Sequence, residues 1–358
     1  MPLSTSILPS FPEGLPLAPI ATVSYKQLLD GNHNDASRVL EAAQTHGFFY
    51  LDLQGAPEGD TFLSEAEQLY ALAKDAFASP LDEKLQFALE RGVSLFGYKP
   101  TGTVKTTDRS QRPDSTEFIC IAKDHLHGVT PSRLYPPPIE QHRPLLQSFT
   151  RHGHACGMLI LRTLASRLGL APDAFTRLNR FDQPSGDHCR LTHTGPHSAD
   201  ANNVLGLPSH TDFGSVTVLF NWLGGLQIES PSSISSSGSS SSSHESEWLW
   251  VQPLPGHAIV NLGDAMVTFT NGTLKSAKHR VVPPLGSQGA ADRYSVVYFV
   301  RPHNDVPMRA LGEFDRGSGL AAAAAAKAVA GKFSAGLEEG EVLTAGEWMR
   351  RRAVQLGN

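Results

Sequence analysis

The spacing of apolar residues changes along the chain, and this change limits the folds that the sequence can adopt. Apolar side chains recur at helical spacing through most of the first half. From about His188 they form short runs separated by Gly, Pro and Asn. These runs cover 213–220, 224–229, 247–252, 257–261, 265–270, 277–282 and 293–301. Many short strands at such spacing are typical of an antiparallel sandwich or barrel.

The first half of the chain reads mainly as helix. Helices are expected at about 36–43, 61–78, just after Pro80, and at 142–169. A buried strand is expected at 48–53. The stretch 95–102 is too rich in Gly and Pro for regular structure and is predicted to be a loop.

This order of elements predicts an α+β protein with a mainly β core. It fits a jelly roll flanked by an N-terminal helical layer and by C-terminal helices. The 358 residues suffice for one large domain or two modest ones. The expected divisions are a helical and mixed domain at 1–180, a β core at 181–305 and a helical segment at 306–358.

Three further segments have distinctive sequences. Serine dominates 230–246, which predicts a disordered hairpin loop and, as a less favoured alternative, a phosphorylated switch. The alanine-rich stretch 320–330 predicts a surface helix or a flexible connector. Thr344 and Glu347 are spaced as a capping box, so a last helix is expected to begin there, with Arg350 to Arg352 near its C-terminal end.

Composition excludes several classes of protein. The formal net charge of −5 gives no basic footprint for nucleic acid. Three widely spaced cysteines predict neither a disulfide framework nor a zinc ribbon. The Pro-broken first twenty residues do not resemble a secretory signal, and no apolar run is long enough to cross a membrane. These features predict a cytoplasmic protein with no nucleic-acid or membrane partner, and they predict no oligomeric state.

The chemistry of the chain centres on His210-Thr211-Asp212. Side chains two residues apart lie on the same face of an extended segment. His279, in a later strand-like run, would bring a second imidazole to this pair. Two histidines and one carboxylate, with the remaining coordination positions open, are the ligand set of non-haem Fe(II) oxygenases. With fifteen histidines in the chain, either histidine alone is more simply a hydrogen-bonded surface or core residue.

A second pair of residues suits a cosubstrate of such a metal. A 2-oxo acid can chelate the ion through its 1-carboxylate and keto oxygen, and its far carboxylate then needs an anion anchor. The Arg293 guanidinium provides one with bidentate geometry. Ser295, two residues on, points to the same side of the strand. An Arg-x-Ser pair alone is expected often by chance, and it becomes informative only together with the predicted metal ligands.

Several stretches resemble the Fe(II)/2-oxoglutarate dioxygenases of the isopenicillin N synthase-like family, as that family occurs in fungal biosynthetic enzymes. The resemblance covers nearly the whole chain. Its motifs are Gly47-Phe-Phe49, Gly97-Tyr-Lys-Pro100 with Glu117-Phe118, His210-Thr-Asp-Phe-Gly-Ser-Val-Thr-Val-Leu-Phe220, Leu223-Gly-Gly-Leu-Gln-Ile228, Asn261-Leu-Gly-Asp264, Thr270-Asn-Gly-Thr273 and Arg293-Tyr-Ser-Val-Val-Tyr-Phe-Val-Arg-Pro302.

The resemblance implies a double-stranded β-helix that uses Fe(II), 2-oxoglutarate and O2. It implies iron on His210, Asp212 and His279, with 2-oxoglutarate on Arg293 and Ser295. The implied activity is oxidation of a small, largely apolar metabolite, with secondary-metabolite biosynthesis as the expected setting. Hydroxylation, desaturation, ring closure and ring expansion all remain open.

The sequence departs from the family pattern at one cosubstrate position. Where the family usually has a tyrosine that hydrogen-bonds 2-oxoglutarate, this chain has Thr194, whose shorter side chain can still donate a hydrogen bond. Neighbouring His193 and His197 are interpreted as supporting or surface residues rather than additional ligands.

Five aromatic residues are candidates for the substrate pocket, and for each of them core packing is an equal alternative. They are Phe96, Tyr98, Phe118, Phe213 and Phe299. Two other functions stay open at this point. In one, an iron oxidase works without 2-oxoglutarate and uses Arg293 and Ser295 to hold the carboxylate of its substrate. In the other, a metal-free barrel binds a small molecule.

Overall fold

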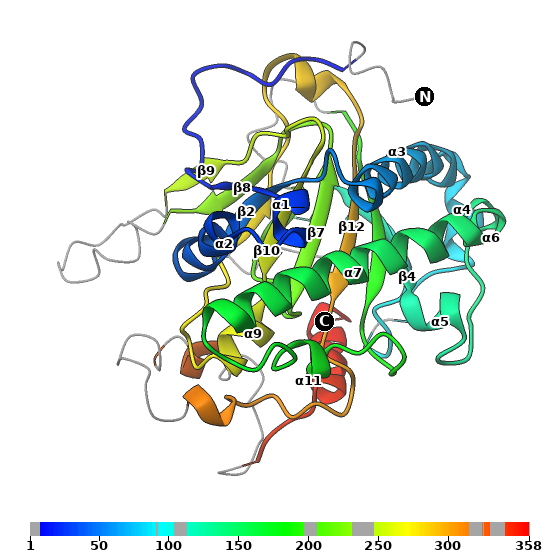
Figure 1. Ribbon diagram of the computed structural model, residues 1–358. Coiled ribbons are helices and arrows are strands. Elements are labelled where there is room, and N and C mark those ends of the chain that lie inside the picture. Colours follow the sequence, from blue (N-terminus) through cyan, green and yellow to red (C-terminus); the bar gives the residue numbers. More distant parts are fainter. Residues whose placement is uncertain are drawn as a thin grey trace, which may run out of the picture.

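Two β-sheets form the centre of the computed structural model (Figure 1), which describes residues 8–90, 92–103, 113–196, 206–230, 247–314, 324, 326–329 and 341–357. The larger sheet has the strand order β1-β2-β10-β7-β12-β5-β4-β3, and the smaller has the order β6-β11-β8-β9. The strands are β1 Thr22–Ser24, β2 Phe48–Asp52, β3 Gly97–Lys99, β4 Thr116–Ala122, β5 His188–Thr194, β6 Leu207–His210, β7 Val216–Asn221, β8 Leu226–Glu229, β9 Trp248–Trp250, β10 His257–Leu262, β11 His279–Val281 and β12 Arg293–Val300. Neighbouring strands are antiparallel, except that β1 and β2 are parallel.

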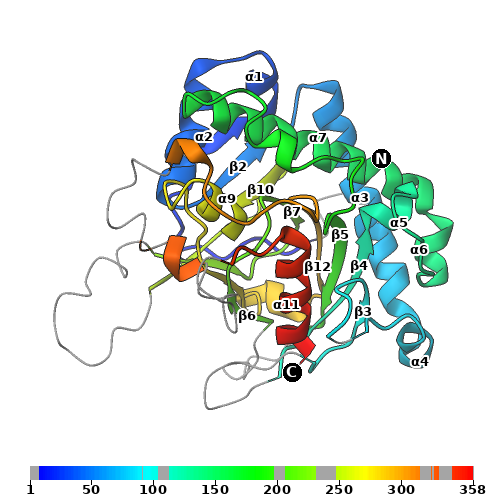
Figure 2. The ribbon, with the colours of Figure 1, turned by 90° about the horizontal axis from the view of Figure 1, so that it is seen from below.

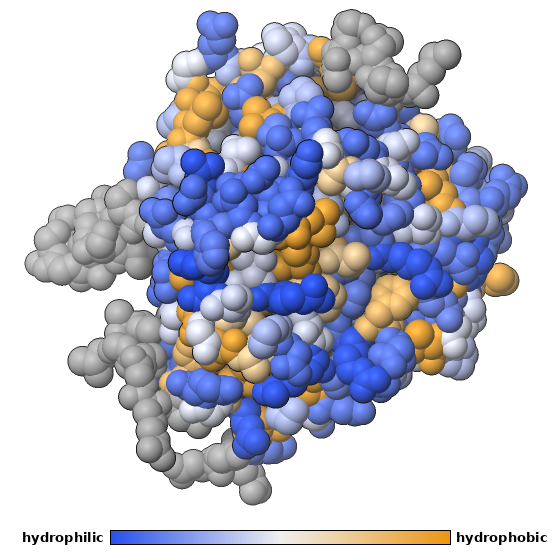
Figure 3. Space-filling model, viewed as in Figure 1, coloured by the Kyte–Doolittle hydropathy of each residue, from blue (hydrophilic) through white to orange (hydrophobic). Residues whose placement is uncertain are grey.

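Helices cover one face of the larger sheet. They are α1 Tyr25–Leu29, α2 His33–Thr45, α3 Pro57–Ala78, α4 Leu81–Leu85, α5 Lys123–His127, α6 Pro137–Gln141 and α7 Arg143–Arg167, with α9 Asp264–Phe269 and α11 Ala345–Gly357 elsewhere. Figure 1 shows α7 crossing the front of the sheet with α3 beside it, and both contact β12 and β5. Figure 3 shows this side of the molecule, where polar residues predominate and apolar ones form small patches. The apolar sides of these helices contribute to the main core.

The other face of the larger sheet looks toward the smaller sheet and is called the inner face here. Phe48 and Ile259 on this face pack with Ile228 of the smaller sheet. Because strand side chains alternate, Arg293, Ser295, Val297 and Phe299 of β12 share one side of their strand. The cross-strand pairs of this set place Thr194, Thr192, Arg190 and His188 of β5 beside it, in that order.

The predicted fold class is confirmed: the chain forms a jelly roll with helices at its N-terminal half. The last helix also has its predicted cap, since the Thr344 backbone N–H donates to Glu347 Oε2 at 2.8 Å and the Glu347 N–H donates to Thr344 Oγ1 at 3.3 Å. The division into 1–180, 181–305 and 306–358 stays a prediction, and strands from the first two ranges share one sheet.

Four details of the predicted secondary structure are wrong. Residues 265–270 were expected as a strand and belong mostly to helix α9, and the expected loop 95–102 contains β3, whose backbone pairs with β4. Helix α3 begins earlier than expected, at Pro57, because proline suits the first turn of a helix. Arg350 to Arg352 lie near the middle of α11 rather than in its last turn.

Two low-complexity predictions fall largely outside the described residues. The serine-rich run lies there from residue 231 to 246, between β8 and β9, which pair with Glu229 opposite Trp248. Of the alanine-rich stretch 320–330, residues 326–329 are helical. Within the described part of the chain, no helix has the length and apolar character that a membrane crossing requires.

Candidate metal centre

His210, Asp212 and His279 lie together where the two sheets meet. His210 is the last residue of β6, and His279 begins β11 directly opposite it. Asp212 follows in the loop that leads from the smaller sheet to β7 of the larger one. Asp212 Oδ1 lies 3.8 Å from His210 Nε2 and 4.0 Å from His279 Nε2. The three candidate ligand atoms all lie within 4.8 Å of one another.

Backbone carbonyl groups orient both imidazole rings. His210 Nδ1 lies 2.9 Å from the Pro208 carbonyl oxygen, and His279 Nδ1 lies 3.2 Å from that of Ala277. A proton on Nδ1 is needed for each of these hydrogen bonds, so Nε2 keeps its lone pair. This arrangement is typical of histidines that bind a metal through Nε2.

The carboxylate of Asp212 has one committed oxygen. Oδ2 accepts hydrogen bonds from Thr217 Oγ1 at 2.7 Å and from Asn261 Nδ2 at 2.8 Å. Burial by itself would raise the pKa of Asp212, but the neighbouring His279 and His210 and these two hydrogen bonds lower it to about 2. The carboxylate is therefore ionised at neutral pH, with Oδ1 directed to the two imidazoles.

A close backbone contact holds the loop that carries Asp212. The Asp264 N–H donates to the Asp212 carbonyl oxygen at 2.7 Å. A Cβ atom on Gly263 would lie 2.2 Å from the carbonyl oxygen of Gly214, so only glycine permits this approach. The start of α9 thus supports the ligand loop.

These residues fit a divalent iron. Two imidazole nitrogens and one carboxylate oxygen are the donors of the facial triad that leaves further positions open. Both carboxylate–imidazole separations are shorter than two metal–ligand bonds of about 2.1 Å placed end to end. A negative carboxylate between two neutral imidazoles gives such an ion partial charge compensation.

Arg293 and Ser295 lie on the inner face near this triad. The Arg293 side chain is 3% exposed, and its Nε donates to the Gly224 carbonyl oxygen at 2.7 Å. Gly225 has a φ of +110°, and a Cβ there would lie 3.1 Å from Arg293 Nε, so glycine makes room for the guanidinium. Burial lowers the pKa of Arg293 to about 10. Within the described part of the chain, no carboxylate pairs with this buried cation, so the site fits an anionic ligand.

The two threonines of β5 have different neighbours on this face. Thr194 pairs with Arg293 across the strands, and its hydroxyl lies 2.9 Å from Thr116 Oγ1. Thr192 was not predicted from the sequence, yet its hydroxyl contacts that of Ser295 directly. His193 points to the helix-covered face, where it lies 2.8 Å from both Glu117 Oε1 and Asp292 Oδ1. His197 lies outside the described residues.

The structure divides the five aromatic pocket candidates. Phe299 and Phe118 lie on the inner face, on either side of the Arg190 guanidinium. Phe213 follows Asp212 and lies beneath the Arg301 guanidinium at 3.9 Å. Phe96 contacts the His188 ring.

Tyr98 does not belong to this group. Its hydroxyl donates to Glu117 Oε2 at 2.6 Å, and its register places it opposite Ile119 on the helix-covered face. Tyr98 therefore packs in the core on the face opposite the triad, which agrees with the core-packing alternative and leaves Tyr98 out of the proposed pocket.

Two arginines that lie beside these aromatic rings, Arg190 and Arg301, are not among the site residues predicted from the sequence. Each is an isolated arginine in a strand-like run, and no spacing links them. The pairing of β5 with β12 brings Arg190 to the Phe299 ring, which Arg301 also approaches, and this requires the register of two strands about a hundred residues apart.

Comparison with known proteins agrees with this geometry. Residues 185–302 match the model of the 2OG-Fe(II) oxygenase superfamily, and residues 19–138 match that of the N-terminal region described as non-haem dioxygenase in morphine synthesis. A 2-oxoglutarate-dependent dioxygenase of Aspergillus fumigatus is 32% identical over 311 residues, which are 84% of this chain and 80% of that protein. One from Gibberella zeae is 32% identical over 291 residues, covering 79% and 80%.

A solved structure supports the fold. A full-length Neurospora crassa protein, crystallised in complex with alpha-KG, superposes with a TM-score of 0.72 at 21% identity, covering 96% of this chain and 98% of the other. The fold, the two matched regions and the fungal relatives agree with one another. The chain belongs to the 2OG-Fe(II) oxygenase superfamily and is a dioxygenase that uses Fe(II) and 2-oxoglutarate.

Proposed function

We propose that this enzyme oxidises a small organic metabolite, in secondary-metabolite biosynthesis, at an Fe(II) ion held by His210, Asp212 and His279. The main support for these ligands is that the Nε2 atoms of His210 and His279 both lie close to Oδ1 of the ionised Asp212 carboxylate. The other oxygen of this carboxylate, Oδ2, is already hydrogen-bonded. The fungal relatives support the biosynthetic setting, since several of them are 2-oxoglutarate-dependent dioxygenases.

Arg293, Ser295 and Thr192 form the proposed anchor for the far carboxylate of 2-oxoglutarate. The Arg293 guanidinium supplies charge and a planar pair of donors, and the Ser295 hydroxyl supplies a further contact on the same face. Thr194, beside Arg293, is proposed to limit where the cosubstrate lies. When bound, Fe(II) with 2-oxoglutarate and O2 supplies the oxidation of the substrate, with succinate and CO2 as the products of 2-oxoglutarate.

The remaining residues of the site orient the metal ligands or exclude water. Thr217 and Asn261 engage Oδ2 of Asp212, so this carboxylate would hold an Fe(II) ion through Oδ1. Phe213, Phe299 and Phe118 provide apolar surface that keeps water from the reacting region. The two alternatives, an oxidase without 2-oxoglutarate and a metal-free binding protein, are disfavoured by family membership.

Anaerobic titration of the purified protein tests this proposal. We expect His279→Ala to lower the affinity for Mn(II), an oxygen-inert substitute for Fe(II), by at least about 100-fold because one of three ligands is lost. The matched control is His257→Ala, since His257 is a strand histidine whose Nδ1 also contacts a backbone carbonyl. Unchanged Mn(II) binding by the His279 variant would refute the ligand assignment.

The cosubstrate anchor is tested on the same samples. We expect Arg293→Gln to leave Mn(II) binding intact and to weaken 2-oxoglutarate binding by about 100-fold, since a charge-assisted contact contributes roughly 2–3 kcal/mol. Arg151→Gln is the control, because Arg151 lies over Phe181 and away from the inner face. Equal 2-oxoglutarate affinity in both variants would contradict the anchor.

A further inference from the structure

Five lysine and arginine side chains are buried in the described part of the chain. They are Lys84, Lys99, Lys123, Arg293 and Arg301. The three lysines each pair with a carboxylate, namely Glu117, Asp114 and Asp124. Arg293 is the proposed anchor for 2-oxoglutarate. Arg301 is left, 5% exposed and without an ion pair to any described residue.

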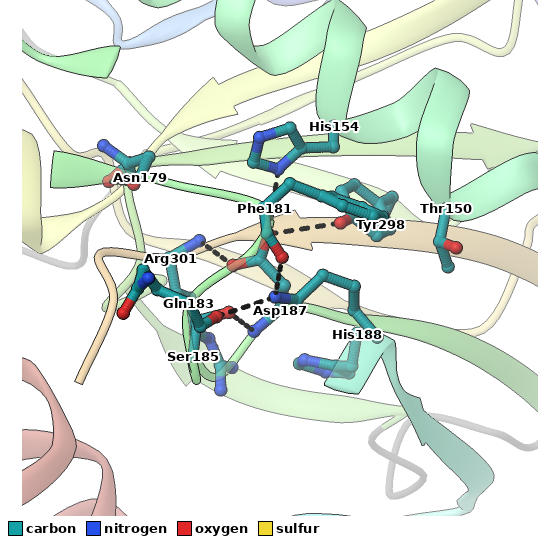
Figure 4. A network of polar contacts seen from close by, with 12 residues as sticks. Thr150, His154, Asn179, Phe181, Gln183, Ser185, Asp187, His188, Tyr298 and Arg301 are labelled. Carbon is teal, nitrogen blue, oxygen red and sulfur yellow. Dashed lines mark hydrogen bonds and ion pairs between the residues drawn. The ribbon is translucent and has the colours of Figure 1, made fainter. Parts of the chain in front are cut away.

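The Arg301 guanidinium has unused donors. Its Nε and Nη1 atoms are buried and make no hydrogen bond. The nearby carboxylate of Asp187 is committed elsewhere, as Figure 4 shows: Oδ2 bonds His154 Nδ1 and the Tyr298 hydroxyl, and Oδ1 accepts from the backbone N–H of Arg301 itself. A buried donor that lacks an acceptor costs about 1–3 kcal/mol, and more when it is charged. A ligand that supplies acceptors would remove this cost.

Packing holds this guanidinium in place. It lies 3.9 Å over the Phe213 ring, next to Asp212, and a Cβ on Gly186 or Gly214 would come within about 3 Å of the Arg301 side chain. The attraction to the Phe213 ring offsets part of the burial cost but accepts no hydrogen bond. Arg301 is thus rigid and directed, as a binding residue must be.

A second arginine adds to the positive charge. The Arg190 guanidinium lies 4.6 Å from the Phe118 ring centre and 4.8 Å from that of Phe299, and Arg301 lies 5.6 Å from the same Phe299 ring. Arg190 Nε contacts Cys120 Sγ, and its terminal nitrogens bond no described residue. Burial and then the charge of Arg190 lower the pKa of Arg301 to about 9, so Arg301 remains a cation at neutral pH.

His188 does not add a third charge. Its ring stacks on Phe299 at 4.5 Å, and its Nδ1 lies 2.9 Å from the Gly186 carbonyl oxygen. Burial, followed by the charges of Arg301 and Arg190, lowers the pKa of His188 well below its ordinary value. The cationic surface therefore consists of the two arginines and the rings beside them.

This surface is separate from the proposed cosubstrate anchor. Arg293 begins β12 and Arg301 directly follows its last residue, so the two are eight residues apart, which is roughly 26 Å at about 3.3 Å per residue. The five-carbon chain of 2-oxoglutarate is far too short to reach both. A small cavity adjoins Arg301 and Phe213, and Trp348 and Met349 of α11 also line it. Figure 2 shows α11 at this end of the sheets.

We propose that Arg301 and Arg190 bind a carboxylate of the substrate, so that the enzyme acts on a planar or aromatic carboxylic acid rather than on a neutral apolar molecule. This inference rests on the proposed function and narrows its substrate class. Guanidinium groups recognise carboxylates with paired hydrogen bonds, and Phe299, Phe118 and Phe213 provide the adjoining apolar surface. Both arginines act as specificity-determining residues here.

The test uses the full chain saturated with Mn(II) and 2-oxoglutarate. Binding of benzoate, phenylacetate and 3-phenylpropionate is compared with that of their amides by calorimetry and ligand-observed NMR. At least one acid is expected to bind at least about 10-fold more tightly than its amide, as expected for one charged hydrogen-bonded contact. We expect Arg301→Gln and Arg190→Gln to abolish that preference, and Arg151→Gln to keep it.

The other outcomes overturn either the carboxylate proposal or the proposed function. Amides that bind as well as acids, no binding by any of the six compounds, or a preference that survives in both variants would overturn the proposal. If Arg301→Gln does not fold, Arg190→Gln decides, because Arg190 is only half-buried. A parent protein that binds neither Mn(II) nor 2-oxoglutarate would instead refute the proposed function.

Discussion

At the scale of single residues, hydrogen bonds fix the orientation of each candidate metal ligand. Asp212 would offer two equivalent oxygens if it were free, and Thr217 and Asn261 occupy one of them. The same principle applies to both histidines, whose Nδ1 atoms contact backbone carbonyls. The supporting hydrogen bonds therefore shape the coordination as much as the ligands do.

Removing one supporting hydroxyl tests this point. We expect Thr217→Val, which keeps the shape of the side chain, to weaken Mn(II) binding by about 10-fold, the lower end of the range for such partners. The physical reason is that Asp212 Oδ2 then has only Asn261 to hold it. Thr163→Val is the matched control, since the Thr163 hydroxyl bonds a helix carbonyl. Equal affinities in the two variants would count against the role of Thr217.

At the scale of elements, a polar network ties adjacent strands together on the helix-covered face. Glu117 of β4 accepts hydrogen bonds from His193 of β5, from Tyr98 of β3 and from Lys84 of α4. Burial would raise the pKa of Glu117, but these three partners lower it. The pKa of His193 shifts the opposite way: burial lowers it, and the hydrogen bonds with Glu117 and Asp292 more than compensate and raise it.

This network predicts a pH dependence of stability. Because the pKa of His193 is higher in the folded chain than its ordinary 6.5, its contribution is complete below pH 6.5 and is lost as the pH rises through the raised value. We expect the free energy of unfolding of the parent to exceed that of His193→Asn most at low pH, with the difference shrinking at high pH. Urea unfolding across a pH series measures it.

The control for that series is His33→Asn, which changes an exposed histidine at the start of α2. Half-buried histidines whose pKa burial lowers, such as His46 and His127, contribute with the opposite sign and cancel in the comparison with the parent. A difference between parent and His193→Asn that stays constant with pH would contradict the network.

At the scale of the whole molecule, the helical layer packs closely on one face of the larger sheet, opposite the inner face. Gly153 and Gly157 of α7 lie against β12, where added Cβ atoms would come 2.6 Å from the Tyr298 ring and 2.6 Å from Val300. Glycine costs helix stability of about 1 kcal/mol relative to alanine. Close packing of α7 on β12 outweighs this cost.

Gly153→Ala is therefore expected to destabilise the protein although alanine favours helix. Overpacking typically costs about 1–3 kcal/mol, against a gain in helix propensity of about 1 kcal/mol, so a net loss of up to about 2 kcal/mol is expected. Thermal and urea unfolding measure it. Gly195→Ala, where a Cβ meets no atom within 4 Å, is the control and should leave stability nearly unchanged. A more stable Gly153 variant would show that the contact can relax.

The amino-acid sequence by itself predicted the jelly roll, the triad and the proposed cosubstrate pair. Each follows from a local pattern: alternation within strands, His210 two residues before Asp212, and Arg293 two residues before Ser295. Local spacing also identified the cap of α11, because both of its partners lie within one turn. The cap and the His-x-Asp pair can be recognised in the sequence because their members are close neighbours in the chain, whereas His279 was recognised by its place in a later strand-like run.

Only the tertiary structure decided which other residues share the site. The face of Tyr98, the contact of Thr192 with Ser295, and the approach of Arg190 to the Phe299 ring follow from strand register. A shift of one residue in register moves every side chain to the opposite face, and local spacing does not encode that choice. The candidate metal ligands could therefore be recognised in the sequence, whereas the proposed cationic substrate surface required the fold.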